Sequence, residues 1–81
     1  MQIRVVAFAR LRELLEVPEL RLELRGGASA NDAWTLLARE RPALAAERRS
    51  TRVALNGRIV SFDASLAEGD ELALLPPVGG G

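Results

Sequence analysis

The side chains that most often carry out chemistry in proteins are missing from this chain. Its 81 residues include no Cys, His, Tyr or Lys, so every positive side chain is an arginine. Without thiol or imidazole groups there is no Ser-His-Asp arrangement, no zinc finger and no disulfide framework. The group with the clearest chemical potential is the carboxylate of the last residue, Gly81, because a terminal carboxylate has a pKa of about 3.5 and is ionised at neutral pH.

A free carboxylate is a poor electrophile until a better leaving group is attached to it. Attaching AMP would give an acyl-adenylate, and a sulfur or nitrogen nucleophile could then attack Gly81 with no side chain in its path. The catalytic groups, and the metal ion that ATP requires, would belong to a partner protein. We therefore expect this chain to bind no cofactor or metal ion, with ATP used by the activating enzyme.

The residues before Gly81 are of types that suit an extended segment able to enter another protein. Pro76 and Pro77 cannot donate ladder hydrogen bonds, and the Val-Gly-Gly-Gly that follows them has little side-chain bulk to pack. We expect a domain over residues 1–75 and an extended tail over residues 76–81. Such a tail spans roughly 20 Å, enough to reach into a cleft. The alternative is a frayed end or a linker remnant, which is the commoner origin of glycine-rich ends.

Other polar clusters have structural explanations. Glu68, Asp70 and Glu71 lie in and beside a glycine turn, where Asp is favoured for backbone reasons, so no metal site is implied. The arginines within 48–52 follow Glu47 and have no aromatic residues between them. That pattern favours a solvated face over a surface for RNA or phosphate.

Composition points to one small domain without a preference for charged partners. The 11 basic side chains balance 11 acidic ones, so no global field attracts nucleic acid or anionic lipid. The apolar runs are too short for a membrane span, and the amino terminus lacks the basic and then apolar pattern of a secretory leader. We therefore expect a cytoplasmic protein with no nucleic-acid or membrane partner.

The elements that must position the tail begin with two strands around a short helix. Residues 2–8 and 19–25 alternate in polarity as strands do, and the second alternation is the clearest in the chain. Between them, leucines recur at helical spacing from Ala9 until Pro18 stops the helix.

A longer helix follows a pair of glycines. Ser29 and Asp32 fit a capping box that opens a helix running to about Arg41. Trp34 lies on its apolar stripe, which favours a core position over a cofactor stack. Pro42 can then begin another helical turn that runs through Glu47.

The last third of the chain predicts a hairpin and a buried strand. Residues 52–55 and 58–60 flank Asn56-Gly57, the dipeptide best suited to a tight hairpin turn. After a turn around Gly69, residues 72–75 form a nearly continuous apolar run, which is typical of a central strand. The predicted class is α+β, with one mixed sheet and one main crossing helix. The order resembles the β-grasp, or ubiquitin-like, arrangement, in which the last strand lies beside the first in the middle of the sheet.

Short stretches at both ends of the fold carry a resemblance to a known family. These stretches are Phe8-Ala9, Arg12-Glu13-Leu14, Val60-Ser61-Phe62-Asp63, Leu66, Gly69-Asp70-Glu71, Pro76-Pro77-Val78 and Gly80-Gly81. Together they resemble the small, sulfur-carrying subunits of molybdopterin synthase. In that family a ubiquitin-activating-like adenylyltransferase adenylates the terminal glycine, which becomes a thiocarboxylate. The tail then enters the large synthase subunit and sulfurates cyclic pyranopterin monophosphate during biosynthesis of the molybdenum cofactor.

The resemblance implies roles for particular residues. Gly81 would carry the sulfur, and Gly79 and Gly80 would thread the channel. The chain would be a sulfur-donor subunit, because the other catalytic groups belong to the large subunit. Its implied partners are that large subunit and the adenylyltransferase. The implied docking residues are Phe8, Ile59, Leu75, Pro76, Pro77 and Val78.

Three other functions share the same tail. A sulfur carrier for the thiazole of thiamine or for tRNA thiolation would use the same activation and a different receiving protein. A ubiquitin-like modifier would be joined through Gly81 to lysines of other proteins, and the absence of lysine here fits either activity. An inert binding domain would make no use of the tail at all.

Overall fold

The computed structural model describes residues 1–77, so Val78, Gly79, Gly80 and Gly81 lie outside the described residues. The elements, in chain order, are β1 (Gln2–Ala7), α1 (Ala9–Leu15), β2 (Glu19–Glu23), α2 (Ala30–Glu40), η1 (Pro42–Ser50, a 3₁₀ helix), β3 (Arg52–Leu55), β4 (Arg58–Val60) and β5 (Glu71–Leu75). No helix among residues 1–77 is both long enough and apolar enough to cross a membrane.

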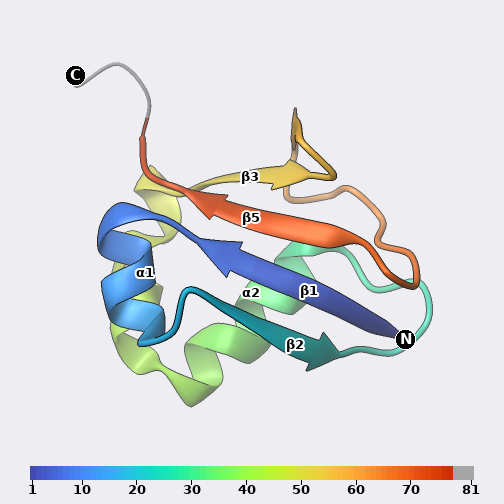
Figure 1. Ribbon diagram of the computed structural model, residues 1–81, viewed down its shortest axis with the longest axis horizontal. Helices are drawn as coiled ribbons and strands as arrows, with labels where there is room; N and C mark the ends of the chain where they lie inside the picture. Colours follow the sequence, from blue (N-terminus) through green and yellow to red (C-terminus); the bar gives the residue numbers. More distant parts are fainter. Residues whose placement is uncertain (78–81) are drawn as a thin grey trace.

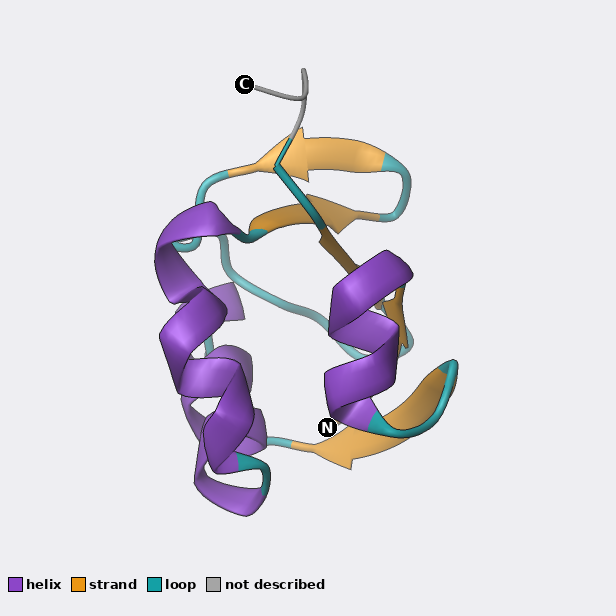
Figure 2. Ribbon diagram, turned by 90° about the vertical axis from the view of Figure 1, so that its left-hand side faces the viewer, coloured by secondary structure: helices purple, strands orange, loops and turns teal. Residues whose placement is uncertain are grey.

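The strands form one mixed sheet in the order β2-β1-β5-β3-β4. β5 pairs in parallel with β1 and antiparallel with β3, and the other two pairings are antiparallel. In Figure 1, α2 crosses behind the sheet and β5 lies beside β1 in its middle. The turned view in Figure 2 shows helical segments standing to one side of the strands. The predicted α+β class and β-grasp arrangement are confirmed.

A long-range contact helps to end α1, and a local capping box begins α2. α1 ends at Leu15, before Pro18, because Glu16 takes a left-handed conformation with φ of 75° and the Arg41 side chain donates to the Leu15 carbonyl at 2.7 Å. At the start of α2 the predicted capping box is present. The Ser29 hydroxyl accepts from the Asp32 amide at 3.2 Å, and the Asp32 carboxylate accepts from the Ser29 amide at 2.8 Å.

The core lies between the sheet and the helices. The inner face of the sheet contributes fully buried side chains from β1, β3 and β5, and the helices add further buried leucines. Trp34 is only 4% exposed, as its place on the helical stripe predicts. Its ring meets Phe62 edge to face, with ring centroids 6.1 Å apart, a favourable aromatic arrangement.

The segment after Pro42 differs from the prediction in type and length. A single helical turn through Glu47 is expected, whereas the structure has a 3₁₀ helix that runs to Ser50. Two contacts account for the extension: Leu44 is fully buried, and the Thr51 hydroxyl donates to the Glu47 carbonyl at 2.6 Å. The Leu44 side chain holds the segment against the core, and the Thr51 hydrogen bond closes its carboxyl end. Neither contact can be read from helix propensity.

One arginine of the 48–52 segment has a structural role. Arg49 and Arg52 are exposed, as expected, but Arg48 is partly buried. Its guanidinium carbon lies 3.4 Å from the centroid of the Phe62 ring, and its Nη2 is 3.4 Å from Asn31 Oδ1. The prediction of a solvated face is therefore wrong for Arg48, because a cation over an aromatic face is attracted by the ring.

Two turns set the geometry beside the central strand. Asn56 and Gly57 both have positive φ, 50° and 87°, which confirms the predicted tight hairpin. The Asn56 side chain bonds Asp70 at 2.9 Å and the Glu71 amide at 2.9 Å. Asp70 also accepts from the Ala67 amide at 2.7 Å. The Asp70 carboxylate therefore stabilises the turn through these hydrogen bonds, which agrees with the structural explanation of the acidic cluster.

Candidate functional site

The tail is attached to the central strand of the sheet. β5 has hydrogen-bonded neighbours on both sides and ends at Leu75. The amide of Phe8 donates to the Leu74 carbonyl at 3.3 Å, which extends the β1–β5 pairing to the last residues of the strand. Pro76 is half-buried and Pro77 exposed, and neither belongs to a strand. The start of the tail therefore has a fixed position and direction (Figure 1).

The outer face of the sheet, which none of the helices within residues 1–77 covers, carries an apolar surface beside this point. The strand register aligns Val6 with Ala73, Ala73 with Ala54 and Ala54 with Ile59, across four strands. Leu75 lies two residues beyond Ala73, on the same face. Phe8 continues the alternation of β1, with φ of −130° and ψ of 154°. We call this surface the apolar patch; it consists of Val6, Phe8, Ala54, Ile59, Ala73 and Leu75.

Exposure within the apolar patch is uneven. Phe8 is 50% and Ile59 56% exposed, and they are the large hydrophobic side chains left exposed among residues 1–77. Ala54 and Ala73, between them, are nearly buried. The patch is thus a shallow floor of alanines with a large apolar side chain at either side. An exposed apolar area of this kind is typical of a protein-binding surface.

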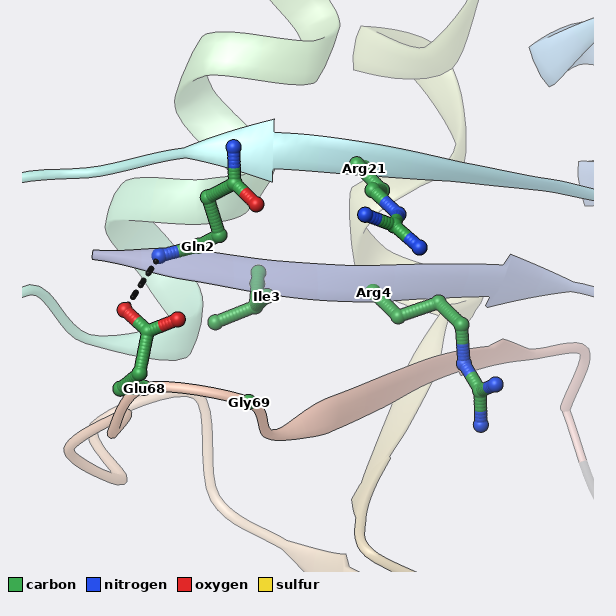
Figure 3. A pocket seen from close by; sticks show the side chains of 6 residues that line it. All are labelled: Gln2, Ile3, Arg4, Arg21, Glu68 and Gly69. Carbon is green, nitrogen blue, oxygen red and sulfur yellow. Dashed lines mark hydrogen bonds between the residues drawn. The ribbon is translucent and has the colours of Figure 1, made fainter.

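The other end of the outer face is charged. Arg4 contacts the Glu71 carboxylate and lies 3.9 Å from that of Glu19. A shallow hollow of about 330 Å³ lies here, and Figure 3 shows Arg4 and Arg21 on neighbouring strands at its border. Glu68 closes one side by accepting from the Gln2 amide at 2.9 Å. Of the predicted site residues, those that the structure describes all lie outside this hollow.

Two carboxyl groups outside the apolar patch have a pKa below the ordinary value. The pKa of Asp32 is lowered mainly by the hydrogen bond that its carboxylate accepts from the Ser29 backbone amide. The pKa of Glu23 is lowered mainly by the hydrogen bond that its carboxylate accepts from the Met1 ammonium group. Both effects belong to structural contacts. Within residues 1–77, no three acidic side chains come close enough together to hold a metal ion.

The predicted docking residues fall into two groups. Phe8, Ile59 and Leu75 lie on one sheet face around the start of the tail, and Pro76 and Pro77 follow them directly. Val78 and the three glycines lie outside the described residues. Sequence reasoning missed Val6, Ala54 and Ala73. The signal for them was an apolar residue at the outward-facing position of each of three strands, but only the register shows that they form one surface.

Comparison with known proteins gives this geometry a context. The pattern that defines the ThiS family matches residues 5–81. The molybdopterin synthase sulfur carrier subunit of Arabidopsis thaliana is 36% identical over 99% of this chain and 83% of its own length. Small archaeal modifier protein 1 of Haloferax volcanii is also 36% identical, over 91% of this chain and 94% of its own.

Solved structures agree with the sequence relatives. A putative molybdopterin converting factor subunit 1 from Pyrococcus furiosus superposes with a TM-score of 0.88. It is 31% identical, and the superposition covers 96% of this chain and 99% of that one. Because the family pattern spans nearly the whole sequence and full-length relatives share more than a third of it, this chain belongs to the ThiS family.

Proposed function

We propose that this chain is the sulfur carrier of a molybdopterin synthase and holds the sulfur as a thiocarboxylate on Gly81. The observation that carries the proposal is the position of Leu75: the central strand ends there, and the tail begins beside an uncovered apolar patch. The names of the relatives from Arabidopsis and Pyrococcus support the choice of pathway.

Every step of the proposed chemistry takes place at the carboxyl group of Gly81. A carboxylate oxygen of Gly81 attacks the α-phosphorus of ATP, and pyrophosphate leaves. Hydrosulfide then attacks the acyl carbon, and AMP leaves with the oxygen, so the product is a thiocarboxylate. Its sulfur adds to a carbonyl carbon of cyclic pyranopterin monophosphate, and the π electrons of that carbonyl move to its oxygen, which takes a proton. Water finally cleaves the bond between the acyl carbon and the sulfur, which leaves sulfur on the substrate and restores the carboxylate.

Gly79 and Gly80 allow these steps to occur inside partner proteins. Without a Cβ atom, a glycine backbone fits a channel that larger residues would block. Pro76 and Pro77 restrict the backbone before the glycines, which lowers the entropy lost when the tail enters a cleft. The chain thus supplies reach and a reactive end, and the partners supply the catalytic side chains.

The apolar patch docks the domain on its partners. Phe8 and Ile59 are the large exposed anchors, and Leu75 links them to the start of the tail. A few anchor residues usually carry most of the binding energy of an interface. Because the tail has a single origin, the adenylyltransferase and the large subunit use the same patch in turn.

Intact mass spectrometry tests the sulfur step. The protein is incubated with a ubiquitin-activating-like adenylyltransferase, Mg-ATP and hydrosulfide. The expected product has one oxygen replaced by sulfur, on a C-terminal peptide that ends at Gly81. A variant lacking Gly80 and Gly81 is the matched control and should stay unmodified. If a known carrier is converted under the same conditions and this chain is not, the proposal is wrong.

The receiving protein separates this pathway from the other sulfur carriers. The thiocarboxylated chain is added to a molybdopterin synthase large subunit with cyclic pyranopterin monophosphate, and in parallel to thiazole-forming and tRNA-thiolating systems. We expect product only in the first reaction. If product forms only in the thiazole-forming or the tRNA-thiolating reaction, the chain is a sulfur carrier for that pathway instead.

The likeness to small archaeal modifier protein 1 favours a second function, attachment to other proteins. In this case the activated carbonyl of Gly81 forms an amide with a lysine of another protein, and AMP leaves. A tagged chain expressed in cells then gives higher-mass adducts that disappear when Gly81 is deleted. Adducts that persist without Gly81 would exclude this chemistry.

A further inference from the structure

β2 is an unpaired edge of the sheet, and its outward backbone groups can be identified from the neighbouring strand. β1 is its only partner strand in the described part of the chain (Figure 1). The Leu24 amide donates to the Met1 carbonyl at 2.8 Å, and the Ala7 amide donates to the Pro18 carbonyl at 3.1 Å. Even-numbered residues therefore bond to β1. The amides and carbonyls of the odd-numbered residues of β2 point to the open edge.

The charges along this edge follow a self-complementary order. Glu19, Arg21 and Glu23 are exposed on the outer face, and Arg25 follows two residues later. Two copies can pair antiparallel about a twofold axis at Leu22. Each Arg21 then lies opposite Glu23 of the second copy. Arg25 lies beyond the end of β2 and bonds Asp32 of its own chain at 3.3 Å, so it is not counted among the cross-strand pairs. Opposite charges placed directly across two strands stabilise the pairing.

The same register suits the hydrogen bonds and the leucines. It places Arg21 and Glu23 as a hydrogen-bonded pair, and both have the outward-pointing backbone groups that such a pair needs. On the inner face, Leu20 lies opposite Leu24 of the second copy, and Leu22 lies opposite its equivalent. A register shifted to centre on Arg21 would instead oppose Arg21 to itself and Glu19 to Glu23. The charge order thus favours one register over its neighbour.

The surroundings of Arg21 give independent support. Within residues 1–77, no carboxylate lies within 4.0 Å of its guanidinium group. The residue directly opposite on β1 is Arg4, a like charge, whose side chain already contacts Glu71. Figure 3 shows these two arginines on adjacent strands. Arg21 is therefore an edge charge whose nearest cross-strand neighbour is unfavourable.

We propose that β2 is a self-association edge, through which two copies of this chain join their sheets antiparallel about Leu22. The interface is isologous, so each contact occurs twice. It is narrow, below about 1,200 Å² in total, so the dimer is weak and reversible. Because the axis is perpendicular to the sheet, both apolar patches face the same side and stay uncovered. This inference does not depend on the proposed function.

Sedimentation of paired charge variants tests the register. The variants Arg21→Glu and Glu23→Arg each create two like-charge pairs in the homodimer. We expect the dissociation constant of each variant to rise at least about tenfold, since inverting two cross-strand pairs changes the binding free energy by about 1–2 kcal/mol. An equimolar mixture makes every cross-strand pair opposite in charge again. Its dissociation constant should return to near that of the unmodified chain.

Arg58→Glu is the matched control, because it changes the net charge equally on the other edge strand, β4. It should dimerise like the unmodified chain, and circular dichroism should show that all variants are folded. The proposal is overturned if the unmodified chain is monomeric up to millimolar concentration. It is also overturned if Arg58→Glu weakens association as much as Arg21→Glu, or if the mixture stays monomeric.

Discussion

The two faces of the sheet are built by the same strands and differ in what they do. On the inner face, Leu72 and Leu74 are 0% exposed, whereas on the outer face Ile59 is 56% exposed. Leu74 and Leu75 are neighbours in the sequence, yet one is in the core and the other beside the tail. Strand alternation therefore separates stability from recognition residue by residue. A substitution on one face should alter folding, and a substitution on the other should alter binding.

Leu74→Ala should give the largest effect. Deleting a fully buried leucine side chain leaves a cavity and lowers the free energy of unfolding by about 2–5 kcal/mol. Leu75→Ala, one residue away on the outer face, should cost clearly less. Urea denaturation followed by tryptophan fluorescence measures both. If both variants lose the same free energy of unfolding, the inner and outer faces contribute equally to stability and the comparison fails.

Phe8→Arg tests the outer face. Replacing this anchor with a charge should weaken binding to a synthase large subunit by about thirtyfold, corresponding to about 2 kcal/mol. The free energy of unfolding should change by no more than about 0.5 kcal/mol, because the side chain is half-exposed. Calorimetric titration gives the affinity. Thr35→Arg, an equal charge on the exposed side of α2, should bind normally, and a similar loss there would remove the patch from the interface.

Ser29→Ala tests the layer that covers the inner face. It removes the hydroxyl that accepts from the Asp32 amide, and loss of such a helix cap costs about 1 kcal/mol. Thermal unfolding should show the loss, while affinity for the large subunit should be unchanged. Ser65→Ala, at an exposed hydroxyl outside the helices, is the control. A changed affinity in Ser29→Ala would show that the helical layer affects the outer face.

Acidification should give the smallest effect, and it should act on stability. The hydrogen bond from Ser29 lowers the pKa of Asp32, so the ionised carboxylate stabilises the folded state. This contribution is present above the ordinary Asp range and is lost as pH falls through the lower folded pKa. Stability should therefore decline below about pH 4. Asp32→Asn should show a flatter decline between pH 4 and pH 2, and an unchanged slope would assign the effect to other carboxylates.

Local features of the sequence predicted much of this fold. Asn56-Gly57 determines its own turn, because both residues tolerate positive φ. Ser29 and Asp32 satisfy each other within one helical turn. The apolar run of β5 indicates burial on both faces, which in a single sheet requires a central strand. In each case the stabilising partners lie a few residues apart or follow from composition.

Features that depend on long-range contacts could not be predicted. Arg48 packs on Phe62 because the end of η1 meets the loop after β4. Ala54 and Ala73 join the apolar patch only because their strands pair in one register. Phe8 suits a core as well as a surface by composition, and its exposure follows from its position after the last strand residue of β1. The role of Gly81 rests on the sequence and on the relatives.

The central position of β5 also determines how the domain responds to force. A pull on the tail acts along the strand axis, parallel to β1 on one side and antiparallel to β3 on the other. Such a load is shared by the hydrogen bonds of both ladders, which must shear together. An edge strand under the same load would peel away one bond at a time. Tension applied beyond Leu75 would therefore load both ladders at once, and the sheet would resist it better than if the chain left from an edge strand.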